Sequence, residues 1–181
     1  MARSIADVFL GLTVSGGFGL LLASPAIAAT PNPCALLTQA EVAGAFPGAK
    51  AGVPETTREK YGIFGCIWTA PGGRIVAQYW NNENPTTAKV EAESLVSGAL
   101  DPFKNGAAAA VLSRSIPGVG QSAHAAIARI DAARGVLNDF AIVAVVVGDR
   151  TITIMSPELA TRDPVKAFAT LTALARSAAT R

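Results

Sequence analysis

The spacing of apolar residues in the second half of the chain predicts strands. Residues 123–130 alternate small or apolar side chains with polar ones, and residues 140–147 form an almost uninterrupted β-branched run. Residues 148–150 then predict a turn, after which residues 151–155 return as a paired strand. Because residues 141–147 are apolar at nearly every position, we expect this strand to lie in the middle of a sheet, covered on both faces.

The first half of the chain predicts a short helix followed by a hairpin. Residues 38–41 have the T-x-x-E pattern of a capping box, which begins a helix, and Pro47-Gly48 ends it. Residues 49–62 combine charged residues with Gly and Pro, which predicts a surface loop. Residues 64–69 and 74–80 are typical of two strands joined by a Pro-Gly-Gly turn, so we expect them to form a hairpin.

Two further segments have helical patterns. Asn84-Pro85 caps a helix that we expect to run through about Val96 and to stop at Gly98. Residues 107–113 fit either a strand or a helix, and Asp163-Pro164 begins a C-terminal helix. The predicted order is therefore α-β-β-α-(β)-β-β-β-α. Because hairpins dominate this order, we expect an α+β fold with a mainly antiparallel sheet and helices packed on it.

The N-terminal segment has the pattern of a cleavable signal peptide, which we assign to residues 1–28. Arg3 precedes an apolar run over residues 8–22, and small residues in the A-x-A arrangement follow. The run is shorter than the roughly 20 residues of a spanning helix and contains glycines, so a retained membrane anchor is the less favoured alternative. We expect an exported protein, periplasmic or secreted, with no stable membrane span after cleavage. Residues 29–181 are long enough for a single domain with its own core, which we expect to be a monomer.

The charged residues are spread along the chain. The formal net charge is +2, from 15 Lys and Arg and 13 Asp and Glu. No run of basic residues alternates with aromatic ones, so the composition argues against nucleic-acid binding. The partners that remain are an envelope protein or a small ligand.

The chain has two cysteines, Cys34 and Cys66. In an exported protein such a pair favours one structural disulfide, here between the early helix and the first strand of the hairpin. A redox couple is the alternative, but the two residues lack the C-x-x-C spacing that tunes a reactive thiolate. Two thiols and one histidine are too few for a four-ligand metal site, so we expect no metal and no other cofactor.

His124 is the only histidine, so any histidine-based catalysis must use it. Ser122 lies two positions earlier and would share a strand face with it. Asp131 and Asp139 follow as candidate acids, which would complete a Ser-His-Asp triad. The chain lacks the G-x-S-x-G elbow that presents a nucleophilic serine, so a surface or rim histidine is the favoured interpretation. His124 is also a candidate for ligand binding.

Three aromatic residues gather near the predicted hairpin: Trp68, Tyr79 and Trp80. The amide-rich segment at residues 81–84 follows them, and aromatic rings beside amides can line a groove for a small molecule or glycan. Buried core aromatics next to a polar loop would give the same pattern, and we favour that interpretation.

Three short motifs give the chain a resemblance to a known group of proteins. They are the C-x-L-L-T-x-x-E-V pattern at residues 34–42, the C-x-W pattern at residues 66–68, and the Pro-Gly-Val-Gly turn at residues 117–120. The chain resembles small exported bacterial proteins and lipoproteins of unknown function with a PsbP-like or LpqN-like fold. The resemblance implies a domain of sheet and helices, a disulfide between the two cysteines, and no catalytic residues to carry over. Unlike the lipoprotein members, this chain has no lipobox before Cys34.

These patterns favour binding over catalysis. An export signal without a catalytic motif predicts an exported envelope domain that acts by binding or as an accessory to other envelope proteins. Two alternatives stay open. One is a small-ligand-binding protein that uses the region of Trp68 and Trp80, and the other is a hydrolase that uses Ser122 and His124.

Overall fold

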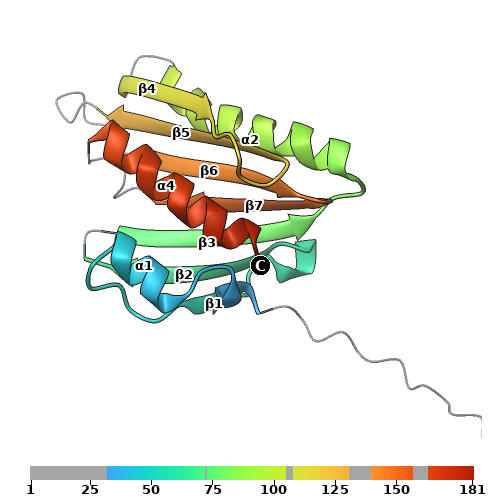
Figure 1. The fold of residues 1–181 in the computed structure, drawn as a ribbon, viewed down its shortest axis with the longest axis horizontal. Coiled ribbons are helices and arrows are strands. Elements are labelled where there is room, and N and C mark those ends of the chain that lie inside the picture. The colour runs from blue at the N-terminus through green and yellow to red at the C-terminus, as the bar shows by residue number, and fades with distance from the viewer. Residues whose placement is uncertain (1–31, 72, 105–107, 131–139, 157–162) are drawn as a thin grey trace, which may run out of the picture. The chain divides into compact units, whose positions relative to one another are not determined.

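A single antiparallel sheet organises the part of the chain that the computed structural model describes, residues 32–71, 73–104, 108–130, 140–156 and 163–181. Within these residues seven strands pair in the order β1-β2-β3-β7-β6-β5-β4, and every pairing is antiparallel (Figure 1). The strands are β1 (Val53–Glu55), β2 (Phe64–Ala70), β3 (Gly73–Asn81), β4 (Ala108–Ser115), β5 (Ser122–Ile130), β6 (Phe140–Val147) and β7 (Arg150–Met155). The predicted α+β class and antiparallel sheet are confirmed.

Three α-helices fall within the described residues. They are α1 (Gln39–Ala45), α2 (Pro85–Lys104) and α4 (Pro164–Ala179), with short 3-10 turns η1 (Pro33–Ala35) and η2 (Glu59–Tyr61). The predicted capping box begins α1: the Glu41 N–H donates to Thr38 Oγ1 (3.2 Å), and the Thr38 N–H donates to Glu41 Oε2 (2.6 Å). Asp163 caps α4 by accepting a hydrogen bond from the Val165 N–H (2.8 Å).

Two predictions about local structure are wrong. The expected loop at residues 49–62 contains β1, a three-residue edge strand that pairs Val53 with Ile67 of β2. Gly98 does not stop α2, which continues to Lys104. A helical glycine costs only about 1 kcal/mol relative to alanine, and the burial of Val96 and partial burial of Ala99 against the sheet favour continuation. The ambiguous residues 107–113 lie largely in β4.

The predicted signal peptide, residues 1–28, lies outside the described residues. So do Asp131 and Asp139, the two acids considered as partners of His124. Pro31–Arg181 form one compact unit. No helix within the described residues is long and apolar enough to cross a membrane.

Helices cover both faces of the sheet. On one face, α4 and the N-terminal elements pack over a large core that includes Trp68, Ile154 and Leu171. On the other face, α2 lies over β4–β7 and contributes the small residues Ala88 and Ala92, which allow the helix to approach the sheet closely (Figure 1). The strand β6 contacts both α2 and α4, so the expected central strand covered on both faces is confirmed.

The expected Cys34–Cys66 disulfide is present, with 5.0 Å between the two Cα atoms. It joins β2 to η1, the short turn that precedes α1, and not to the early helix itself. Cys66 is completely buried, and the backbone of Gly52 passes directly beside it. A Cβ at Gly52 would lie 2.6 Å from Cys66 Sγ and 2.7 Å from the ring of Trp68. The segment before β1 can therefore approach the disulfide this closely only because it carries no side chain at this position.

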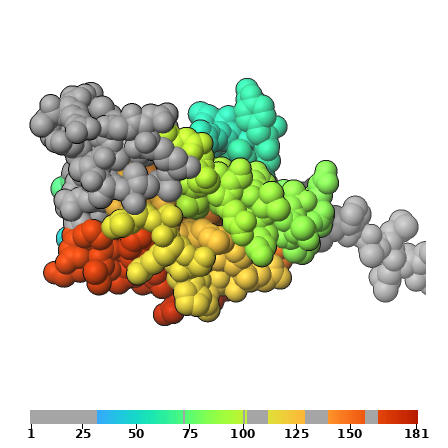
Figure 2. Space-filling model, turned by 90° about the horizontal axis from the view of Figure 1, so that it is seen from above, coloured from blue at the N-terminus to red at the C-terminus, as the bar shows by residue number. Residues whose placement is uncertain are grey.

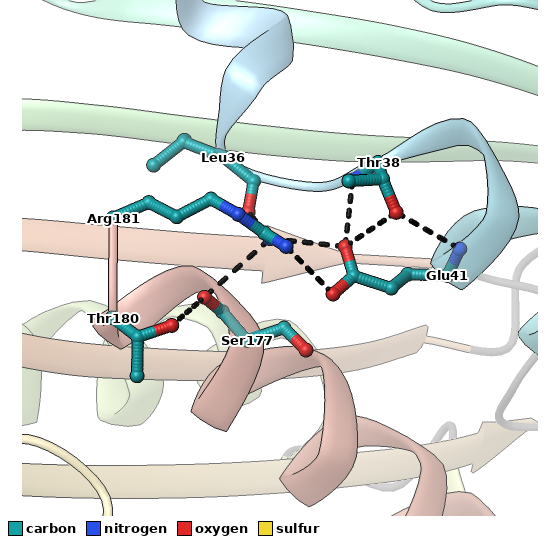
Figure 3. Close-up of polar contacts among 6 residues, drawn as sticks. All are labelled: Leu36, Thr38, Glu41, Ser177, Thr180 and Arg181. Atoms are coloured by element: carbon teal, nitrogen blue, oxygen red, sulfur yellow. Dashed lines mark hydrogen bonds and ion pairs between the residues drawn. The ribbon is translucent and has the colours of Figure 1, made fainter.

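A second connection joins the C-terminal residue to α1 (Figure 3). Arg181 donates from Nη1 to the Leu36 carbonyl oxygen (2.9 Å) and forms a two-pronged pair with the Glu41 carboxylate, at 2.9 Å and 2.8 Å. The guanidinium holds the pKa of Glu41 at about 2, below its ordinary 4.5, against the opposing effect of burial; hydrogen bonds from Thr38 add to the lowering. The carboxylate thus serves both the helix cap and the C-terminus.

Candidate functional site around His124

The sheet register places His124 beneath α2. His124 on β5 lies opposite Ser115 on β4 and Ala144 on β6. Ala144 belongs to the core cluster packed against α2, and successive strand residues alternate between faces. The side chains of His124, Ser122 and Ser115 therefore share the face that α2 covers.

A turn and a hydrogen-bonded threonine fix this arrangement. Before β5 the chain turns through Gly120, whose φ is 56°, and a Cβ there would collide with the Val146 carbonyl. At the start of α2, Thr151 Oγ1 on β7 donates to the Ala88 carbonyl oxygen (3.4 Å) and accepts from Asn82 Nδ2 (2.9 Å). The turn sets the start of β5, and the threonine ties α2 to the sheet.

The His124 imidazole contacts a carboxylate and two hydroxyl groups. Glu93 Oε1, from α2, lies 3.4 Å from His124 Nε2. Ser122 Oγ lies 3.2 Å from the same nitrogen, and Ser115 Oγ lies 3.4 Å from Nδ1. The side chains of His124 and Glu93 are 25% and 47% exposed, so solvent and small molecules can reach both.

These contacts favour one tautomer of neutral His124. An ionised carboxylate only accepts hydrogen bonds, so the neighbouring Glu93 favours a proton on Nε2. Nδ1 is then the acceptor, and the hydroxyl group of Ser115 can donate to it. The basic nitrogen thus faces Ser115 on β4, whereas Ser122, the partner predicted from strand alternation, lies beside Nε2.

Two cavities flank this cluster and share Glu93, Ser115 and His124 in their walls. One has a volume of about 320 Å³ and continues along Ser97 and Ser113. The other has a volume of about 510 Å³ and continues toward the turn before β5. We call the two together the His124 groove. It lies between α2 and the strands β4 and β5. Figure 2 shows α2, in green, beside these two strands, in yellow and light orange.

The predicted aromatic candidates lie elsewhere. Trp68 is 1% exposed and belongs to the core on the α4 face, as does Tyr79, whose ring stacks on Phe64 with 5.3 Å between centroids. Burial raises the pKa of Tyr79. Trp80 is half-buried on β3, and its buried Nε1 has no hydrogen-bond partner among the described residues. None of the three lines the His124 groove, so the structure does not bring them together with His124.

Sequence reasoning missed two members of the cluster, Glu93 and Ser115. Glu93 comes from α2, which β4 separates from the strand of His124 in the sequence, and no local motif connects the two residues. Ser115 is brought opposite His124 by the pairing of β4 with β5. Two signals were available in the sequence. Lys89 and Glu93 are polar residues four apart on a predicted helix, and Ser113 and Ser115 are two apart, as on one face of a strand. Neither signal indicates a common site until the pairing register of β4 and β5 is known.

The cluster offers hydrogen-bonding groups and charge to a ligand, but little support for acyl transfer. Nucleophilic catalysis by serine needs donors that stabilise an oxyanion. The nearby backbone N–H groups of Ile116 and Gln121 already donate to the carbonyls of Ala123 and Val146, each at 2.8 Å. Among the described residues, no group of three or more His, Cys, Asp or Glu side chains could hold a metal ion.

Comparisons with protein-family models, curated proteins and solved structures gave no match. The resemblance to exported bacterial proteins with a PsbP-like or LpqN-like fold therefore stays a prediction.

Proposed function

We propose that this chain is an exported, non-enzymatic domain that binds a small polar ligand in the His124 groove. The observation that carries the proposal is the convergence of Glu93, Ser115 and Ser122 on His124. Of these residues, Glu93, Ser115 and His124 form the wall that two cavities share. Ligand sites combine a concave surface with a few polar groups that fix the orientation of the ligand. This cluster supplies such groups from three separate elements of the fold.

Two features support export. The disulfide between Cys34 and Cys66 is typical of proteins that fold in an oxidising compartment, and residues 1–28 have a signal-peptide pattern. N-terminal sequencing of the protein recovered from its native host tests this part of the proposal. We expect the chain to begin at Ala29, and an intact Met1 terminus on the recovered protein would contradict cleavage.

A fragment screen tests the binding role. Small polar fragments are added to the 15N-labelled protein, and backbone amide shifts are followed. We expect the shifts to concentrate at Ser115, Ser122, Glu93 and their neighbours, and to weaken in His124→Gln. The Lys166→Gln variant on α4 serves as the control. Binding confined to another part of the protein, or equal binding by His124→Gln, would count against the groove.

A hydrolase is the second candidate, because the imidazole contacts both a carboxylate and hydroxyl groups. In this geometry Ser115, facing Nδ1, is the better-placed nucleophile, with Glu93 on Nε2 as the orienting acid. A fluorophosphonate probe distinguishes the two functions, since it labels activated serines. Labelling that disappears in Ser115→Ala or Ser122→Ala would overturn the non-enzymatic proposal, and we expect none.

A further inference from the structure

The helix α2 contributes two side chains of opposite charge, Lys89 and Glu93, to the His124 groove. The groove's third charged residue, Arg114 on β4, lines the 320 Å³ cavity and has its guanidinium over the Phe168 ring of α4. Lys89 and Glu93 are four residues apart on α2, which places their Cβ atoms about 5–6 Å apart on the helix surface. Both line the 510 Å³ cavity, together with Gln121 from the turn before β5. A ligand in this cavity meets a cation and an anion one helical turn apart.

The acidic end of the cavity suits an ammonium group. Glu93 contributes a carboxylate, and the hydroxyl oxygens of Ser115 and Ser122 lie around the same imidazole. These oxygens are acceptors, and a primary ammonium group has three N–H donors. An anionic ligand group at this end would instead be repelled by Glu93.

The other end of the cavity suits a carboxylate. Lys89 brings a positive charge, and the side-chain amide of Gln121 can donate a hydrogen bond. A purely cationic ligand would be repelled by Lys89. A purely anionic ligand would be repelled by Glu93. A ligand with both charges satisfies both ends of the site.

We infer that the His124 groove binds a zwitterion of the amino-acid type, a free amino acid or short peptide with an ammonium group on Glu93 and a carboxylate on Lys89. The inference rests on the proposed binding function and gives it a ligand class. A dipeptide is the useful probe, because one extended residue spans about 3.3–3.6 Å, so its terminal charges can reach side chains one helical turn apart.

Three compounds test the inference by titration into the 15N-labelled protein: L-alanyl-L-alanine, its N-acetyl derivative and its C-terminal amide. The first keeps both charges, the second removes the ammonium group, and the third removes the carboxylate. We expect the parent dipeptide to shift the amides of Ser115 and Ser122 at millimolar concentration. Each derivative should bind about tenfold more weakly, because it loses a hydrogen-bonded charge.

Matched variants assign the two charges. Glu93→Gln should weaken binding of the parent dipeptide about tenfold and leave the affinity for the N-acetyl derivative unchanged. Lys89→Gln should also weaken binding of the parent dipeptide about tenfold, but leave the affinity for the amide derivative unchanged. Glu59→Gln and Lys166→Gln, two exposed positions outside the groove, are the controls. The amide spectra of all four variants show whether each remains folded.

The outcomes separate this inference from the proposed function. Equal binding of all three dipeptides at the groove would overturn the zwitterion and leave a polar-ligand site. The same conclusion follows if no dipeptide binds while another polar fragment shifts the groove amides. If neither dipeptides nor fragments shift these amides, both the inference and the proposed function fail.

Discussion

The pair between Glu41 and Arg181 predicts a specific response to acid. Glu41→Gln removes the negative charge but keeps an acceptor oxygen, and glutamine also completes a capping box. The variant therefore isolates the contribution of the charge that holds the C-terminus against α1 (Figure 3).

The magnitude follows from the depressed pKa of Glu41. A change from 4.5 to about 2 sets an upper limit of about 3 kcal/mol on the stabilisation. The side chains of Glu41 and Arg181 are 27% and 32% exposed, so solvent screening reduces this figure, and we expect about 1–2 kcal/mol. Because the folded-state pKa is the lower one, the stabilisation is fully present above pH 4.5 and is lost as the pH falls toward about 2.

Urea unfolding of the wild type and Glu41→Gln measures the effect at neutral pH and near pH 3. We expect the variant to be about 1–2 kcal/mol less stable at neutral pH, and this difference to fall to less than about half by about pH 3. Glu59→Gln, an exposed carboxylate without such a pair, controls for general charge effects. A difference between wild type and Glu41→Gln that is absent at neutral pH, or equal at both pH values, would refute the reasoning.

Three further variants test the packing by the same unfolding measurement. Gly52→Ala forces a Cβ against Cys66 and Trp68 and should destabilise the fold by about 1–3 kcal/mol; an unchanged stability would show that the segment can move away. Gly98→Ala enters open space on α2 and should stabilise by about 0.5–1 kcal/mol, whereas a loss would argue against a helix through this residue. Removing the bridge with Cys34→Ala and Cys66→Ala together should cost about 3–4 kcal/mol, and a protein of undiminished stability would contradict a structural disulfide.

Local patterns predicted most of the elements because the signals were themselves local. The capping box of α1 depends on two residues three apart, and the central strand β6 depends on a continuous apolar run. The edge strand β1 escaped prediction because three residues that include Pro54 carry no period. It exists because it pairs with β2.

The candidate site was only half predictable. Strand alternation placed Ser122 beside His124 and was sufficient for that pair. Ser115 and Glu93 reach the imidazole through sheet register and helix packing, which depend on residues far apart in the chain. The tryptophans lie outside the site, and their spacing in the sequence could not place them because it does not say what packs over each face of their strands.

The imidazole 1H–15N spectrum of His124 tests the central claim most directly, because the chain has one histidine and its ring signals need no further assignment. The spectrum is recorded while polar fragments that bind the protein are titrated. We predict that Nδ1 and Nε2 shift in step with the amides of Ser115 and Ser122, and that Glu93→Gln weakens the response. Ring signals that stay fixed while fragments saturate the protein would contradict a ligand site at His124.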